Sequence, residues 1–205
     1  MISYQITLED RYRVILGLYL VRQRHLVSTF VYIIVISSDM KWASNAYNMV
    51  KKANKKLWIL GRLKFLGATE LDLVDIYIKQ VRCLLELAVP AWHGAITLVE
   101  QNNIERVQRS AAYIILGDNY LSYKDALKYL GLDSLKNRRD KLCLKFGRKA
   151  EKHEKFRKWF KPTAYKPFTR QAKLKYCGVV SKHTRFEKSP LSFLTRMLNQ
   201  FYRIK

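Results

Sequence analysis

The stretch from Ser44 to Phe65 contains no acidic residue, and its apolar residues follow a helical period. They recur every three or four positions, at Ala46, Val50, Ala53, Leu57 and Leu60. At 100° per residue, the opposite side of such a helix carries Lys51, Lys52, Lys55 and Arg62. The pattern predicts one amphipathic helix that buries its apolar face and ends at Gly67.

The cationic side of this helix has two interpretations. Between positions 51 and 64 the cations are Lys51, Lys52, Lys55, Lys56, Arg62 and Lys64. Such a row suits sequence-independent contacts with phosphates, and it also suits a solvated surface. Trp58 lies in the same stretch, where its ring either stacks on a sugar or base or packs in a core or interface.

The charge of the whole chain favours a polyanionic partner. The 205 residues include 39 Lys and Arg against 16 Asp and Glu, a formal net charge of +23. Self-repulsion of this size is usually offset by nucleic acid, and less often by an anionic membrane. The cations are concentrated in 41–66 and 106–205, while 67–105 is acidic. This division indicates a defined basic face.

Few motifs of enzymes or metal sites are present. Cys83, Cys143 and Cys177 form no CxxC pair, so we expect three thiols in a reducing, intracellular compartment, nuclear or cytoplasmic. The sequence has no P-loop, GxGxxG or HExxH motif. His93 is accompanied by no nucleophile motif and is expected to be a packed or capping residue. We expect no cofactor and no metal site, including at Cys177 and His183.

The N-terminal segment is apolar but too short for a membrane span. The runs 14–21 and 26–36 are separated by Arg22-Gln23-Arg24-His25, and neither approaches the ~20 residues that cross a bilayer. The β-branched and aromatic residues of 30–36 predict a buried strand, with an apolar helix as the alternative. A strand alone forms no stable sheet, so it needs a partner from outside the helical part.

Capping signals divide the rest of the chain into helices. Thr69 with Asp72 predicts a start, with Leu71, Val74, Ile78, Val81, Leu85 and Ala88 as the apolar face and Pro90 as the end. Further helices are predicted from Thr97 to Gly117, from Ser122 to Gly131, from Ser134 to about Lys152, and for about ten residues after Ser189-Pro190. The sequence therefore predicts a mainly α fold, a helical bundle.

Two further basic stretches are candidates for nucleic-acid contacts. Arg138, Lys141, Lys145 and Arg148 are spaced three, four and three apart, which places them in one stripe or on a solvated face. Residues 153–188 are basic and aromatic, with Trp159 as a possible stacking residue, and show weak periodicity. They are expected to be an RNA clamp or a basic loop or tail. The predicted organisation is 1–40, an apolar N-terminal segment; 41–152, a helical domain; and 153–205, a basic extension with a terminal helix.

Several stretches occur in an order that resembles one known family. They are ISSDMKW (36–42), VKKANKKLWILGRLK (50–64), YIKQVRCLLELAVPAWHGAIT (77–97), IERVQRSAAYIILGDNYLSYKDALKYLGLDSLKNRRDKLCLKF (104–146) and RFEKSPLSFLTRMLNQ (185–200). Together they resemble the region after the catalytic palm in reverse transcriptases of non-LTR retrotransposons, the jockey-like and related elements. The most specific pieces are ERVQRSA, LGLDSL and NRRDKL, whereas residues 1–29 match nothing in the family.

This resemblance implies a thumb and post-thumb region. It makes 31–36 the last strand near the primer grip and 44–65 a thumb helix that follows the primer–template duplex. The family's polymerase site needs a pair of carboxylates that hold magnesium, and this chain has no Asp-Asp dipeptide. The chain is therefore expected to be non-catalytic by itself, with the palm and fingers of the parent protein and nucleic acid as partners. The alternatives are an independent RNA- or DNA-binding module and a membrane-peripheral structural protein.

Overall fold

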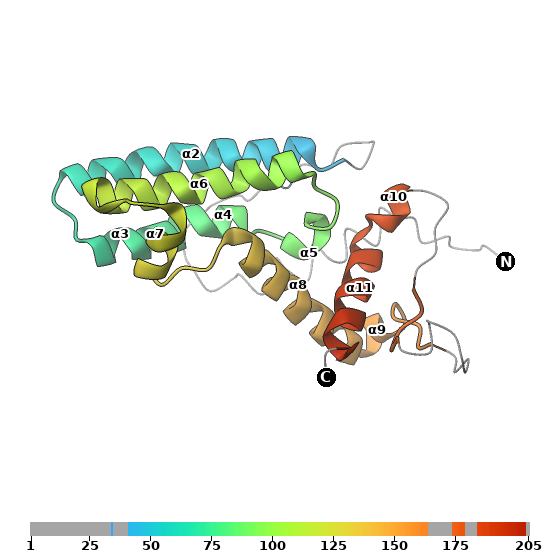
Figure 1. Cartoon of the computed structure of the whole chain (residues 1–205). Coiled ribbons are helices and arrows are strands. Elements are labelled where there is room, and N and C mark those ends of the chain that lie inside the picture. The colour runs from blue at the N-terminus through green and yellow to red at the C-terminus, as the bar shows by residue number, and fades with distance from the viewer. Residues whose placement is uncertain (1–33, 35–40, 164–173, 179–183, 204–205) are drawn as a thin grey trace. The chain divides into compact units, whose positions relative to one another are not determined.

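The computed structural model describes residues 34, 41–163, 174–178 and 184–203, and its described part is mainly helical (Figure 1). This confirms the predicted mainly α class. The strand predicted for 30–36 lies outside the described residues except for Ile34, which has no regular secondary structure. The described residues form two compact units, which do not coincide with the predicted ranges.

The first unit contains 41–87 and 95–141. Its elements are α2 (Ala43–Phe65), α3 (Glu70–Ile76), the π-helix η1 (Tyr77–Arg82), α4 (Cys83–Leu85), α6 (Leu98–Leu116), the short 3-10 helix η2 (Gly117–Asn119) and α7 (Tyr123–Tyr129). The second unit contains 88–94 and the described residues from 142 onward. Its elements are α5 (Val89–Trp92), α9 (Glu154–Arg157), α10 (Thr184–Glu187) and α11 (Pro190–Arg203). α8 (Leu135–Lys152) contributes residues to both units.

α2 packs along α6, and these two long helices organise the first unit (Figure 1). The predicted buried face of α2 is confirmed at Ala46, Ala53, Leu57 and Leu60, while Val50 is half-buried and Met49 is buried instead. The predicted end is also confirmed. Gly67 has φ +87°, its N–H donates to the Lys64 carbonyl, and the Ala68 N–H donates to the Leu63 carbonyl. These two bonds form a Schellman motif, which the left-handed glycine allows.

The helix predicted after Thr69 begins as expected, and its predicted apolar face is confirmed at Val81, Leu85 and Ala88 but not at Leu71. The Thr69 hydroxyl accepts from the Asp72 N–H, which confirms the cap. Leu71 is 83% exposed, and the buried residues are Leu73, Tyr77, Val81 and Leu85, spaced four apart. The physical reason is η1, since the wider winding of a π-helix brings residues four or more apart onto one face. Pro90 also does not end this helix, because it lies in the first turn of α5 after the left-handed Ala88.

The remaining predicted helix boundaries are confirmed. α6 has a complete capping box, in which Thr97 and Glu100 each bond the other's backbone N–H. Gly117, with φ +58°, ends it. Ser122 caps α7, and α8 begins directly after Ser134. α11 starts at Pro190 as predicted and has 14 residues, more than the ten expected.

One carboxylate, that of Glu105 on α6, holds two neighbouring elements. Its oxygens accept from the Tyr123 hydroxyl at 2.5 Å and from the backbone N–H groups of Leu135 and Lys136 at 3.1 and 3.2 Å. The latter two are first-turn N–H groups of α8, which have no partner within the helix. Nearby, the Tyr77 hydroxyl donates to Gln108, whose amide donates to the Asp133 carbonyl. Side chains of α6 therefore fix where α8 starts.

The second unit also has a carboxylate at its centre. Glu151 at the end of α8 is buried and accepts from the hydroxyls of Tyr176 and Tyr202. The Asn199 side chain bonds both the N–H and the carbonyl of Tyr176, each at 2.9 Å. The loop or tail predicted for 153–188 contains short ordered elements where the structure describes it. Those residues include α9, α10 and an antiparallel bridge between Pro162 and Tyr176.

We expect Glu105→Ala to destabilise the protein by about 2–3 kcal/mol, because it removes a charged helix cap and a partly buried hydrogen bond together. Urea unfolding followed by circular dichroism measures this. Glu154→Ala is the matched control, since Glu154 is exposed on α9. Equal stability losses in the two variants would contradict the role given to Glu105.

Stability should also fall at alkaline pH because of Tyr77. Burial raises the pKa of Tyr77 above its ordinary value of 10.0. As the pH rises, Tyr77 therefore loses its hydroxyl proton in the unfolded chain before it does so in the folded protein. Its contribution to the free energy of unfolding is complete below about pH 10 and declines above it by ~1.4 kcal/mol per pH unit. Unfolding free energies measured from roughly pH 9 to 11.5 should fall less steeply in Tyr77→Phe than in the wild type. Parallel curves would contradict this account.

Candidate nucleic-acid interface

The exposed side of α2 presents cations and aromatic rings in one row. At 100° per residue, Lys51, Lys55, Trp58 and Arg62 lie within a sector of about 60°, with Tyr47 and Phe65 at its edge. All six are exposed, and we call them the α2 stripe. Lys52 is exposed on its flank. The predicted outward direction of these cations is confirmed, and whether they bind phosphate stays a prediction.

The aromatic residues of the stripe are open to solvent. Trp58 is 69% exposed and Phe65 is 81% exposed, so Trp58 does not belong to the core of the first unit. The Arg62 guanidinium carbon lies 5.9 Å from the Trp58 ring centroid and 5.8 Å from that of Phe65. These cation–π contacts hold the two rings beside a positive charge.

Two of the predicted cations, Lys64 and Lys56, do not lie in the exposed row. The Lys64 ammonium donates to the carbonyl of Ile115 at 2.9 Å, at the C-terminal end of α6. A positive charge is favourable there because the last helical carbonyls are partly negative and lack helical partners. Gly117 leaves room for this contact, since a Cβ at that position would lie 2.7 Å from the Lys64 nitrogen. Lys64 is thus a structural residue, and Lys56 is half-buried.

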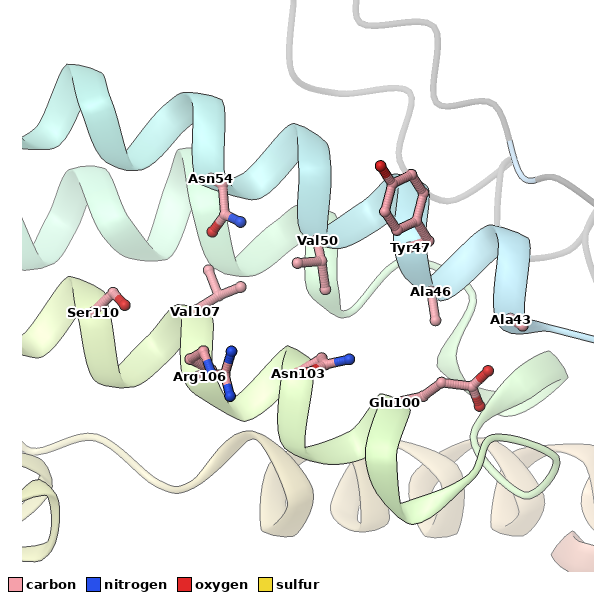
Figure 2. Close-up of a pocket in the computed structure, with 10 residues that line it drawn as sticks. All are labelled: Ala43, Ala46, Tyr47, Val50, Asn54, Glu100, Asn103, Arg106, Val107 and Ser110. Carbon is pink, nitrogen blue, oxygen red and sulfur yellow. The ribbon is translucent and has the colours of Figure 1, made fainter.

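A groove of about 500 Å³ runs beside the stripe, between α2 and α6 (Figure 2). Its floor includes the apolar Ala46, Val50 and Val107. Figure 2 shows Asn54 on the side of α2 that faces α6, and Arg106 on α6 across from it. Beside the α2 stripe, the groove therefore offers amide groups that can form hydrogen bonds, and its α6 side offers a further cation.

The polar residues of α6 that line this groove were not predicted from the sequence. Asn103, Arg106 and Ser110 are spaced three and four apart, which is the helical signal of a common face. The helix ends at Thr97 and Gly117 are predictable from the sequence, but they indicate no role for this polar row. Glu100 also lines the groove, and its carboxylate is bound by the Thr97 N–H and hydroxyl at 2.6 and 3.0 Å.

Arg138, a predicted phosphate contact, is paired inside the first unit. Its guanidinium donates to both oxygens of Glu86, at 2.5 and 3.0 Å, and these hydrogen bonds raise the Arg138 pKa. Arg82 lies 3.8 Å from the same carboxylate. We therefore remove Arg138 from the candidate interface. The planar bidentate geometry is the strong form of an Arg–carboxylate contact.

The other residues of the predicted stripe on α8 differ among themselves. Lys141 is exposed and pairs with Asp133 at 2.7 Å, and this hydrogen bond lowers the Asp133 pKa. Lys145 and Arg148 belong to the second unit and are exposed. The Arg148 guanidinium lies 4.9 Å from the ring centroid of Phe201. Lys145 and Arg148 are therefore the members of this set that remain candidates.

Trp159 is half-buried and its ring centroid lies 4.7 Å from that of Phe156. A ring packed in this way presents less surface for stacking on a base than Trp58 does. His93 is buried, with the rings of Trp92 and Phe193 against it at 6.2 and 5.5 Å between centroids. This confirms that His93 is a packed residue.

The described residues contain neither a cluster suited to a metal ion nor a helix suited to a membrane. Among the described residues, no three His, Cys, Asp or Glu side chains are grouped so that they could hold a metal ion. No helix in this part of the chain is both long and apolar enough to cross a bilayer. Cys83, Cys143 and Cys177 form no disulfide.

Comparisons of the chain with protein-family models, with curated proteins and with solved structures found no match. The resemblance to reverse transcriptases therefore rests on the quoted sequence segments. The physical case for nucleic-acid binding rests on the α2 stripe and the charge of the chain.

We expect Arg138→Met to lower the free energy of unfolding by about 1–3 kcal/mol, since it leaves the largely buried Glu86 carboxylate with fewer partners. Lys145→Met, at an exposed position of the same helix, should change it by less than about 0.5 kcal/mol. Thermal and urea unfolding of the two variants measure the difference. A variant Arg138→Met that is as stable as the wild type but binds RNA more weakly would contradict this structural role and would indicate that Arg138 contacts nucleic acid.

Proposed function

We propose that this chain is the thumb and post-thumb region of a non-LTR retrotransposon reverse transcriptase and that the α2 stripe binds the nucleic-acid backbone. The main support for the proposal is the distribution of charge on α2. α2 has no acidic residue over 23 positions, and its outward face presents Lys51, Lys55 and Arg62 together.

The spacing along the stripe suits a row of phosphates. At 1.5 Å per residue, Lys51 and Lys55 are about 6 Å apart along the helix axis, and Lys55 and Arg62 are about 10 Å apart. A nucleic-acid strand carries a phosphate every ~3.4 Å of its axis, so cations with these separations can each reach a different phosphate of one strand that lies along α2. The exposed rings of Trp58 and Phe65 offer apolar contact to sugars or unpaired bases between those phosphates.

The polymerase reaction is assigned to other parts of the parent protein. The residues present here do not fit the family's magnesium site, because the sequence has no Asp-Asp dipeptide and the acids of 67–105 are used otherwise. Asp72 and Glu100 bond their helix caps, Glu86 pairs with Arg138, and Glu105 holds α8. In this proposal the chain positions a primer–template duplex, and the palm carries out the chemistry.

The test is a salt series on binding to an RNA·DNA duplex. We expect Lys51→Gln/Lys55→Gln/Arg62→Gln to weaken binding at low salt and to reduce the slope of log K against log salt by about 2–3, because each lost phosphate contact removes close to one released counterion. The matched control is Lys124→Gln/Lys128→Gln/Lys136→Gln, which removes the same charge from exposed positions of the same unit. Its slope should stay near that of the wild type.

Three outcomes of the same series would count against the proposal. Equal slopes in the two triple variants would show that the stripe is an ordinary solvated face. Binding to vesicles containing phosphatidylserine, without binding to nucleic acid, would favour a membrane-peripheral protein. Tighter binding to plain RNA than to the duplex would favour an independent RNA-binding module over a thumb.

A further inference from the structure

A second basic feature lies in the second unit and involves none of the residues discussed for the α2 stripe. It is a pocket of about 690 Å³ formed by the end of α8, by α9 and by the bridged segments around Pro162 and Tyr176. Five of the residues that line it are cationic: Lys152, Arg157, Lys158, Lys161 and Lys175.

Among the described residues of the lining, Glu151 is the single acidic one, and its charge is already engaged. Its carboxylate accepts from the hydroxyls of Tyr176 and Tyr202, and the Lys175 ammonium lies 3.7 Å from it. Lys175 therefore offsets Glu151. The described residues of the lining carry a formal charge of +4 in one concave site.

The backbone on one side of the pocket is held in place by hydrogen bonds. The Cys177 N–H donates to the Lys161 carbonyl at 2.9 Å, and the Thr163 N–H donates to the Lys175 carbonyl at 3.1 Å. Asn199 fixes Tyr176 between them. The Lys175 ammonium also lies 3.6 Å from the ring centroid of Tyr202. Lys161 and Lys175 are thus brought together from positions 14 apart in sequence by a defined structure, as a preorganised anion site requires.

We infer that this pocket binds a run of closely spaced phosphate groups, as along a nucleic-acid strand. Lysine and arginine side chains offer only hydrogen-bond donors, and a phosphate offers only acceptors, so the match is one of both charge and hydrogen bonding. The two aromatic residues of the lining, Phe160 and Tyr176, are buried, so the pocket recognises phosphate and not bases. A concave site suits a strand or polyphosphate better than the plane of a lipid surface.

Lysine footprinting of the whole chain tests this inference directly. The chain is acetylated briefly, alone or with a 20-nucleotide RNA, tripolyphosphate, or phosphatidylserine vesicles, and each lysine is quantified by mass spectrometry. We expect RNA and tripolyphosphate to slow acetylation of Lys152, Lys158 and Lys161 several-fold, and to leave the exposed Lys124 and Lys128 of α7 nearly unchanged. Protection by tripolyphosphate alone would identify free polyphosphate as the source of the phosphates.

The inference is overturned if neither phosphate probe protects the pocket lysines more than Lys124 and Lys128, or if only the vesicles protect them. Lys51 and Lys55 are read in the same spectra, so failure of the pocket and failure of the α2 stripe are seen separately. A variant adds a second readout. Lys158→Gln/Lys161→Gln should weaken tripolyphosphate binding at least several-fold, while Lys124→Gln/Lys128→Gln should not, with thermal unfolding as the check on folding.

Discussion

The packing of α2 against α6 is the constraint on which the first unit depends. Burying the apolar face of α2 fixes the rotation of that helix about its axis, and Ala46 and Ala53 keep the buried face narrow. Every residue on the far side must then point outward. Since that side has no acidic residue, the same packing that stabilises the unit also brings the cations and aromatic rings of the α2 stripe together on its outer face.

Four acidic residues of the described part bond to neighbouring elements or helix ends within the fold. Glu105 receives a tyrosine hydroxyl and two first-turn N–H groups of α8, and Glu151 receives two tyrosine hydroxyls in the second unit. Glu86 pairs with Arg138, and Glu100 caps α6. A carboxylate that is buried or half-buried is costly unless it is hydrogen-bonded, and all four of these are hydrogen-bonded. With these acids engaged in the structure, many cations are left at the surface, which is the physical origin of both basic sites.

Much of the fold could be predicted from interactions between residues close in sequence. Contacts between residues far apart in sequence could not be predicted. The caps at Thr97 and Ser122 involve residues three apart, so the sequence alone identifies them. The partners of Lys64 and Arg138 lie 51 and 52 positions away, and no local pattern separates these two cations from those that face solvent. The predicted apolar face of the helix after Thr69 is wrong at Leu71 for another reason. Its residues fit two helical spacings, and burial of Tyr77 in a π-helix selects the one that leaves Leu71 exposed.

The central claim is that nucleic acid lies along the outer face of α2. Photo-crosslinking tests it most directly, with p-benzoylphenylalanine in place of Lys55 in one variant and in place of Lys128, exposed on α7, in another. Irradiated with a labelled RNA·DNA duplex, the first variant should crosslink strongly at low salt and lose the crosslink as salt rises, while the second should crosslink weakly throughout. Equal crosslinking at the two positions, or none at position 55 under conditions where the chain binds the duplex, would contradict the account.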